Sequence, residues 1–250
     1  MRITAIFNIW ADCLCLLPYA IDNIRPVVDD IIVVYSWKSN RGNYMQYDLP
    51  KDCILVHCEP VHGAPHANEL AKRNAGLEKA KELGFTHFIM MDSDEFYDQW
   101  LFDKCKSLFD NPSLVGLVCP VQTYFKSPTL TIGMDTTIVP FIHRLQHGMK
   151  YVQNFKAYPF AIDKSGQARI DGTRRLNINR GVQMAPIVMH HYSYVRREMS
   201  LKLANSSANF KEHRANIVYE DLRNARPGYF CKGYQRELVS CENTFNLPDL

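Results

Sequence analysis

The first 92 residues alternate short, almost uninterrupted apolar runs with segments of helical periodicity. Runs such as "DDIIVVYS" are rich in Ile and Val, which is typical of strands buried on both faces of a parallel sheet. The predicted order is strand 3–7, helix 12–24, strand 29–36, strand 53–58, helix 66–85 and strand 86–92. This order indicates an α/β fold with helices flanking a mainly parallel sheet, where ligands bind beyond the carboxyl ends of the strands.

The rest of the chain is predicted to be less regular. A helix is expected at 98–110, a strand at 116–125, an irregular and partly antiparallel region rich in Gly, Pro and Thr at 127–189, and a helix at 195–214. The last 35 residues show little periodicity and are expected to wrap the surface. We expect one domain over 1–250, made of a first half at 1–125, a second half at 126–215 and a tail at 216–250.

Charge and composition exclude several classes of protein. The 29 basic and 26 acidic residues give a formal charge of +3, too balanced to indicate a nucleic-acid or membrane-surface protein. The eight cysteines contain no C-x-x-C pair, so we expect reduced thiols and a cytoplasmic protein. No apolar run approaches the roughly 18 residues that cross a bilayer. Asp12 interrupts the apolar amino terminus, which argues against a signal peptide. The oligomeric state is left open.

The strand at 86–92 ends in three acids, Asp92, Asp94 and Glu95. Asp92 and Asp94 are two residues apart, so at a strand exit their carboxylates can converge on one cation. Carboxylate oxygens suit Mg²⁺ or Mn²⁺, and such an ion is commonly shared with a substrate phosphate. The cluster therefore predicts a site for a metal and a nucleotide diphosphate. The alternative is that the acids solvate the strand end and cap the next helix.

Two segments resemble glycosyltransferases of the GT-A fold, especially family-two-like enzymes. The first contains Arg73-Asn74, the strand "HFIMMD" and the D-x-D of Asp92 and Asp94, and the second is "MHHYSYVRREMSLKLAN". The resemblance covers roughly residues 3–125 and 185–210. It implies metal-dependent transfer of a single sugar from a nucleotide-diphosphate sugar to an acceptor hydroxyl, by default on a glycan or lipid-linked glycan. Residues 1–125 would bind the donor and residues 126–215 the acceptor.

The resemblance also implies roles for the motif residues. Asp94 would bind Mn²⁺ or Mg²⁺, Asp92 would contact the ribose or reach the metal through water, and His191 would be the third metal ligand. His190 is the rival of His191, and either histidine can instead be a core residue. Three basic residues would stabilise the diphosphate or, alternatively, form a solvated helix face: Arg196, Arg197 and Lys202.

Donor contacts are expected from Asn8, Ser36, Arg73 and Asn74. Many family-two enzymes carry an Asp at the end of the second strand that contacts uracil. Here Tyr35, Ser36 and Ser39 stand in that region, so the donor base and its sugar stay open.

An inverting enzyme also needs a carboxylate base beside the attacking hydroxyl. The candidates are Glu95, Asp135, Asp171, Glu220 and Asp221. Glu95 can instead orient Asp94 as part of the metal site. The sequence does not choose among these acids, nor between inversion and retention.

The segment "ARIDGTRRLNINR", residues 168–180, contains four arginines, Arg169, Arg174, Arg175 and Arg180. It either steers an anionic acceptor, such as a phosphorylated glycan or a hydroxylated base in nucleic acid, or forms a solvated hairpin. Four aromatic residues either stack on sugar or base rings or belong to the core: Trp37, Trp100, Tyr192 and Tyr194. A non-catalytic nucleic-acid or glycan-binding module with a degenerate form of the fold is the rival hypothesis.

Overall fold

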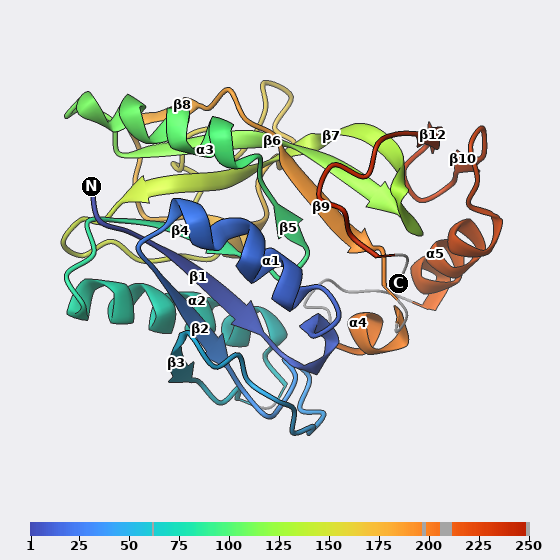
Figure 1. Ribbon diagram of the computed structural model, residues 1–250, viewed down its shortest axis with the longest axis horizontal. Coiled ribbons are helices and arrows are strands. Elements are labelled where there is room, and N and C mark those ends of the chain that lie inside the picture. Colours follow the sequence, from blue (N-terminus) through green and yellow to red (C-terminus); the bar gives the residue numbers. More distant parts are fainter. Residues whose placement is uncertain (62, 197–198, 206–211, 249–250) are drawn as a thin grey trace.

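Parallel strands form where the apolar runs predicted them. The computed structural model describes residues 1–61, 63–196, 199–205 and 212–248. The strands are β1 (Ile3–Ile9), β2 (Asp30–Tyr35), β3 (Ile54–His57) and β4 (His87–Met91). They lie side by side in the order β3-β2-β1-β4, and every neighbouring pair is parallel (Figure 1). Their carboxyl ends therefore share one edge of the sheet.

Helices α1 (Leu17–Ile24) and α2 (Pro65–Glu82) pack on opposite faces of these strands. Successive side chains of β1 point to alternate faces, so Phe7 joins the α1 side of the core and Ile6 the α2 side. Both faces of the strand are buried, which explains why the runs in the sequence are continuous and do not alternate with polar residues.

The contact between α2 and the sheet depends on Gly76. A Cβ atom at this position would lie 2.4 Å from Cγ2 of Ile6 and 2.9 Å from Cγ2 of Val34. The helix backbone therefore lies directly against the strands, at a distance that leaves no room for a side chain.

The second half of the sheet contains the main departure from the predicted elements. It continues from β4 through β7 (Ser127–Arg144), β6 (Gly116–Phe125), β9 (Met189–Tyr194) and β5 (Glu95–Phe96), with β8 (Val182–Met184) beside β6. β7 is antiparallel to β4 and β6, so the predicted antiparallel character is confirmed. The prediction of short irregular runs at 127–144 was wrong, because this segment is one strand of 18 residues.

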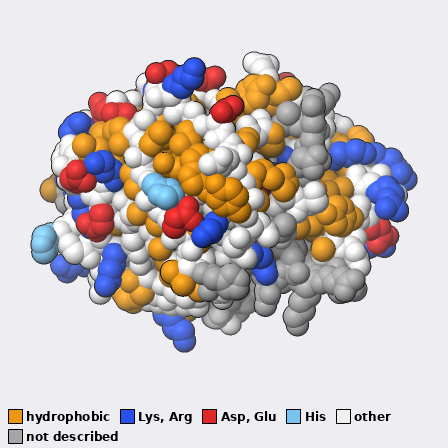
Figure 2. Space-filling view, turned by 90° about the horizontal axis from the view of Figure 1, so that it is seen from below, with side chains coloured by type: hydrophobic (Ala, Val, Ile, Leu, Met, Phe, Trp, Pro, Cys, Tyr) orange, Lys and Arg blue, Asp and Glu red, His pale blue; other side chains and the backbone are white. Residues whose placement is uncertain are grey.

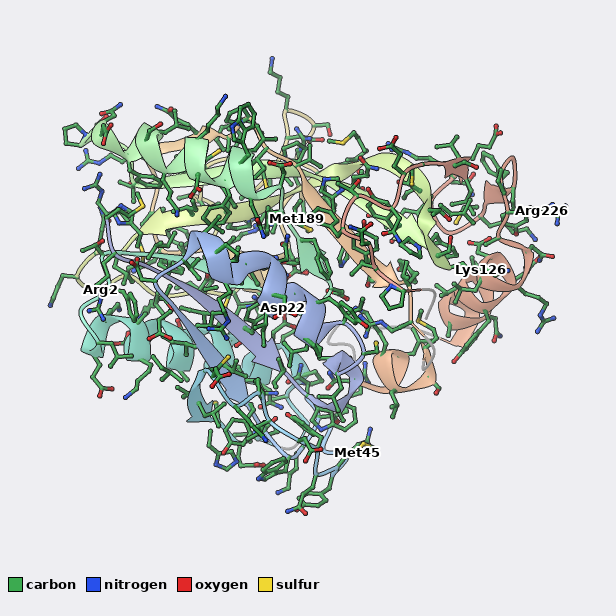
Figure 3. All side chains as sticks on the ribbon, viewed as in Figure 1. Arg2, Asp22, Met45, Lys126, Met189 and Arg226 are labelled. Carbon is green, nitrogen blue, oxygen red and sulfur yellow. The ribbon has the colours of Figure 1, made fainter. Side chains whose placement is uncertain are left out.

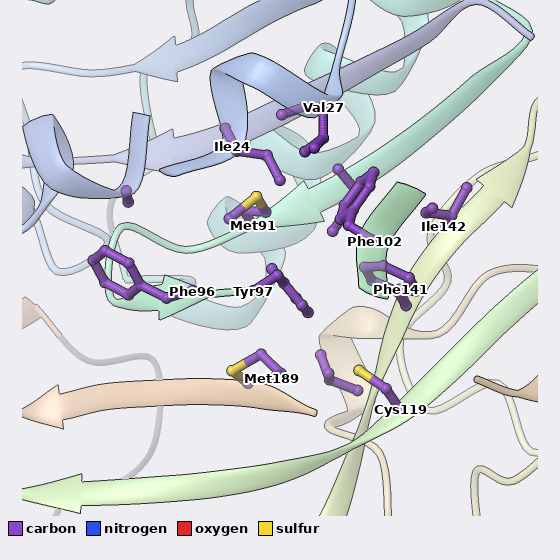
Figure 4. Close-up of a cluster of buried hydrophobic side chains, with 14 of the residues drawn as sticks. Ile24, Val27, Met91, Phe96, Tyr97, Phe102, Cys119, Phe141, Ile142 and Met189 are labelled. Carbon is purple, nitrogen blue, oxygen red and sulfur yellow. The ribbon is translucent and has the colours of Figure 1, made fainter. Parts of the chain in front are cut away.

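A cluster of aromatic side chains lies behind the acidic residues. Helix α3 (Gln99–Lys106) and the 3-10 turn η3 (Ser107–Asp110) form where a helix was predicted, and Phe102 packs on Phe141 of β7 with ring centroids 5.0 Å apart. Tyr97 packs on the same Phe141 ring, also at 5.0 Å (Figure 4). This packing holds the short segment from Met91 to Tyr97 against the core.

The carboxyl-terminal part is more regular than predicted. Helices α4 (Met199–Asn205) and α5 (Glu212–Asn224) replace the single helix expected at 195–214, of which residues 197–198 and 206–211 lie outside the described part. The tail predicted from residue 216 begins inside α5. Residues 216–224, which show little periodicity in the sequence, therefore belong to a helix. Short strands β10 (Phe230–Cys231), β11 (Arg236–Glu237) and β12 (Val239–Ser240) follow, and β12 pairs with β7.

The predicted α/β class is confirmed: helices flank a mainly parallel sheet that continues into a smaller antiparallel part. Within the described residues, no helix combines the length and apolarity needed to cross a bilayer. All eight cysteines are free thiols.

Candidate active site

The acids of the D-x-D segment come together with residues of β9 at the edge of the sheet. Glu95 begins β5, which pairs antiparallel with β9 so that Glu95 lies opposite His191. The amide of Tyr192 donates to the backbone oxygen of Asp94 at 2.8 Å. The two segments identified in the sequence are thus neighbours in space.

Asp94 is the centre of a buried ion cluster. Its side chain receives Nη2 of Arg196 at 2.5 Å and Nζ of Lys202 at 2.7 Å, both on Oδ2. Nε2 of His191 lies 3.7 Å from Oδ1. Burial raises the pKa of Asp94, but Lys202, His191 and Arg196 outweigh it and hold the pKa well below its usual value. Asp94 is only 2% exposed, so its carboxylate is buried. It does not simply solvate the end of the strand, as the alternative interpretation of the acids had it.

His191, and not His190, lies beside Asp94. Nδ1 of His190 is 2.8 Å from the hydroxyl of Tyr124, against whose ring it stacks. His190 therefore packs against Tyr124 and not against the acids, which is the structural role that the alternative interpretation gave to one of the two histidines. Burial lowers the pKa of His191 to about 4, so its ring is neutral near pH 7 and keeps a lone pair for a ligand.

Arg174 was not expected in this cluster. Its Nη2 donates to Asp92 Oδ2 at 2.5 Å and also to Oε1 of Glu95. Burial raises the pKa of Asp92, but Arg174 and Arg73 outweigh it and lower the pKa. For Glu95 burial outweighs Arg174, and the pKa rises to about 7. Only the tertiary fold brings the loop before β8 to the acids, so the sequence carries no local signal for this contact.

Two cavities meet at the cluster. The first cavity lies beyond the carboxyl ends of β1 and β4, and the predicted site residues among its lining are Asn8, Asp92, Asp94, Arg196 and Lys202. The second lies over β6, β7 and β9, and its predicted site residues are Asp92, Glu95, Asp171, His191 and Lys202. Asp92 and Lys202 line both cavities. We call them the donor-side and acceptor-side cavities.

Three further residues line the donor-side cavity and are joined by hydrogen bonds. The side chain of Asn205 in α4 donates to Oδ1 of Asp12 at 3.0 Å and accepts the amide of Asn40 at 2.9 Å. Asp12 and Asn40 belong to loops after β1 and β2, so Asn205 joins these loops to α4. Sequence reasoning missed all three residues, because nothing local marks them.

Several predicted site residues lie outside both cavities. Ser36 is fully buried and its hydroxyl donates to the backbone oxygen of Lys38 at 2.6 Å. The carboxamide of Asn74 exchanges two hydrogen bonds with the backbone of Tyr151. Arg73 is buried behind Asp92 and pairs with Glu69 at 2.6 Å.

The remaining carboxylates differ in accessibility. Asp171 is exposed at the acceptor-side cavity, and its Oδ1 accepts the amide of Thr173 at 2.7 Å. Asp135 is partly buried on β7, where its carboxylate accepts from the hydroxyl of Thr136 and the amide of Thr137. Asp221 is buried among backbone amides of the carboxyl-terminal part.

Two of the four arginines in the segment 168–180, the arginine loop, are engaged inside the protein and are not free to bind an anionic acceptor. Arg174 is in the ion cluster, and Arg175 is buried with its guanidinium donating to Ile170 O at 2.8 Å. On the face seen in Figure 2, acidic and basic side chains are interspersed with hydrophobic ones. Arg197, a predicted phosphate contact, lies outside the described residues.

The residues fit a divalent cation in part. Within the described chain, no group of three His, Cys, Asp or Glu side chains is arranged as a complete metal site. Oδ1 of Asp94 and Nε2 of His191 are 3.7 Å apart, and two atoms at this separation can both contact one ion at about 2.1 Å. Mg²⁺ commonly takes few protein ligands and completes its shell with substrate phosphate and water.

No family model and no curated protein matches this chain. Among solved structures it is similar to S. aureus TarS 1-349, with 12% identity and a TM-score of 0.46, over 90% of this chain and 71% of that chain. It is similar to a glycosyltransferase involved in the glycosylation of the major capsid of PBCV-1, with 13% identity and a TM-score of 0.31, over 57% and 60%. It is also similar to CMP:2-keto-3-deoxy-manno-octonic acid synthetase, with 11% identity and a TM-score of 0.32, over 89% and 87%. At this distance the similarities concern the fold and indicate no activity.

Proposed function

We propose that this protein transfers a single sugar from a nucleotide-diphosphate sugar to an acceptor hydroxyl, with Mn²⁺ or Mg²⁺ bound at Asp94. The observation that supports it is the meeting of two cavities at Asp92 and Lys202, where Arg196 lines only the donor-side cavity and the carboxylates of Asp171 and Glu95 line only the acceptor-side cavity. A transferase needs this arrangement because donor and acceptor approach the reacting carbon from different directions.

On the donor side, Arg196 and Lys202 are the residues proposed to contact the diphosphate. Both already hold a carboxylate oxygen of Asp94, so they are ordered before any ligand binds. As the sugar–phosphate bond breaks, negative charge builds on the diphosphate, and preorganised cations stabilise that transition state more than the ground state. Asn8 and Asp92 also line this cavity and are proposed to contact the nucleoside.

Asp94 and His191 are proposed to hold the cation, with Asp92 near it. Bound there, a divalent ion would offset negative charge on the leaving diphosphate. Arg73 would act indirectly, since it contacts Asp92 at 3.5 Å and is itself buried. Ser36 and Asn74 are left out of the proposed donor contacts because their side chains are engaged elsewhere.

On the acceptor side, Asp171 is the proposed base. A base must reach the attacking hydroxyl, and Asp171 is exposed with Oδ2 available. Glu95 is 1% exposed and its Oε1 is held by Arg174, so it is better placed to keep Arg174 and Asp92 in position. Asp135 lines neither cavity. A neutral glycan or lipid-linked glycan is the proposed acceptor, because Arg174, which lines the acceptor-side cavity, is already paired with Asp92 and Glu95, and Arg175 is buried.

Donor binding is tested by thermal denaturation with UDP, GDP, ADP or CDP, each with and without Mn²⁺. One diphosphate with Mn²⁺ at a hundredfold excess over its Kd should stabilise the fold by about 2.7 kcal/mol, which raises Tm by roughly 5 to 10 °C. A degenerate binding module predicts no shift with any of the four, and that result would remove the proposal.

The assignment of the base is tested by three carboxamide variants in a transfer assay with the nucleotide sugar that binds. Asp171→Asn should lower kcat by about 10²–10⁴-fold with donor affinity unchanged. Asp135→Asn is the matched control and should behave as the wild type. If Asp171→Asn keeps full kcat, Asp171 is not the base.

A further inference from the structure

A third cavity lies on the other side of β5 from the ion cluster. It has a volume of about 500 Å³ and lies between α1, the start of α3 and the segment 244–246. Neighbouring residues of a strand point in opposite directions, so Glu95 faces the cluster whereas Phe96 lines this cavity. The cavity is therefore separate from the donor-side and acceptor-side cavities. We call it the α1–α3 cavity.

The composition of the α1–α3 cavity is unusual for a surface hollow. Its walls carry the aromatic rings of Tyr19, Trp100 and Phe245. Among the described residues that line it, none is basic and none is aliphatic, and the others are aromatic, carboxylate, carboxamide or hydroxyl residues. Trp100 is 64% exposed and Tyr19 is 40% exposed, so these two side chains are accessible to a ligand, whereas Phe245 packs against the buried ring of Phe96.

The cavity is also held in shape. The carboxamide of Asn23 exchanges two hydrogen bonds of 3.0 Å with the backbone of Tyr97, which ties α1 to the segment after β5. Nζ of Lys104 lies 3.3 Å from the centroid of the Trp100 ring, so one face of the indole is fixed by a cation. The ring is therefore oriented before any ligand arrives.

Polar groups around the rings are free to bind. Asp22 projects from α1 and is labelled in Figure 3. Within the described part of the chain, the side chains of Asp22, Thr244 and Asn246 have no hydrogen-bond partner. They place acceptors and donors next to aromatic faces.

We propose that the α1–α3 cavity binds a neutral saccharide chain. A sugar ring has an apolar face of C–H groups, which matches an aromatic ring, and a rim of hydroxyls, which matches carboxylates and amides. An anionic polymer is disfavoured by Asp22 and Asp98 with no cation in the lining, and an acyl chain by the lack of aliphatic side chains. The use of this cavity to hold an acceptor glycan rests on the proposed function, whereas saccharide binding itself does not.

The test is calorimetric titration of the whole chain with maltohexaose, cellohexaose, mannohexaose and fully N-acetylated chitohexaose, without nucleotide and with EDTA. At least one of the four should bind saturably, and Trp100→Ala should weaken that binding by about tenfold or more. Asp22→Ala should also weaken it. Phe230→Ala is the matched control, because Phe230 is 53% exposed on β10 and lies outside the cavity.

Two results would overturn the proposal: no binding of any hexasaccharide at about 10 mM, or binding by Trp100→Ala that equals the wild type. Neither result depends on transfer activity. If nucleotide diphosphates fail to stabilise the fold while a hexasaccharide still binds through Trp100, the transferase proposal falls and this cavity remains a saccharide site.

Discussion

At the scale of single residues, the charges of the ion cluster are already balanced without a metal. Asp92 and Glu95 share Arg174, and Asp94 is held by Arg196 and Lys202. A divalent cation entering alone must compete with these side chains. A cation that arrives with a diphosphate brings negative charge that can take over Arg196 and Lys202. We therefore expect weak binding of free Mn²⁺ and much tighter binding in the presence of the diphosphate.

Arg174→Gln should tighten the binding of Mn²⁺ alone. Removing this cation leaves Asp92 and Glu95 without their main partner. Two unit charges about 4 Å apart interact by about 1 kcal/mol even in bulk water and by more near a protein surface, and the ion carries two charges, so its affinity should rise by at least about tenfold. The paramagnetic resonance signal of free Mn²⁺ measures the affinity directly. Arg169→Gln is the control, since it removes the same charge from the same loop at a residue that donates to the backbone oxygen of Thr136 and lines neither cavity. Equal affinities in the two variants would contradict the competition.

The residues of the candidate site were predictable to very different degrees. Asp92, Asp94 and His191 follow from local motifs, and the structure brings them together. Arg174 and Asn205 were missed because their roles depend on contacts across the chain that leave no spacing pattern. Ser36 is the opposite case, a residue that was expected at the site and lies elsewhere. Its position after β2 suggested a donor contact, but its hydroxyl donates to the backbone oxygen of Lys38 in the turn that it begins.

At the scale of elements, the close contact of α2 with the sheet sets a limit on substitution. Alanine favours a helix over glycine by about 1 kcal/mol, yet Gly76→Ala should destabilise the protein by roughly 1 to 3 kcal/mol because its Cβ would overlap Ile6 and Val34. Urea denaturation measures the change. In a double-mutant cycle, Ile6→Ala should cost less in the Gly76→Ala background than in the wild type, and strict additivity would contradict the steric explanation.

Elements that are defined by nearby residues were predicted well. Each of these elements shows either a continuous apolar run or helical spacing within a single segment, which is enough to predict β1, α1, β2, β3, α2 and β4. β7 was missed because Gly133 adopts a φ of 71° within it and its pairing with β6 changes register several times, which hides the alternation. α5 was missed because it lies across the boundary between the helix predicted at 195–214 and the tail predicted from 216, so the helix was placed too early in the chain.

At the scale of the whole molecule, buried histidines should make the fold sensitive to acid. His143 is 1% exposed and its Nε2 lies 2.8 Å from the hydroxyl of Tyr158. Burial lowers the pKa of His143 to about 3, whereas an unfolded histidine titrates near 6.5. Below pH 6.5 the unfolded chain binds the proton first, so stability is full above that pH and falls as the pH decreases toward 3.

His143→Gln should reduce this loss. Each fully buried neutral histidine contributes about 1.4 kcal/mol of destabilisation per pH unit below 6.5, so the variant should lose about 2 kcal/mol less than the wild type between pH 6.5 and pH 5. The free energy of unfolding from urea titrations at the two pH values gives the difference. An identical loss in both proteins would show that His143 is protonated in the folded state or that other groups dominate.

The pairing of β5 with β9 also has a consequence for biosynthesis. Lys202 and Asp94 are 108 residues apart, and His191 and Arg196 likewise follow β8. A nascent chain that has left the ribosome only as far as β8 therefore exposes every acid of the cluster but none of the partners of Asp94. The ion cluster around Asp94 is therefore completed only after β9 and α4 have been synthesised, and proteolytic cleavage between β8 and β9 should disrupt this cluster while leaving the earlier strands paired.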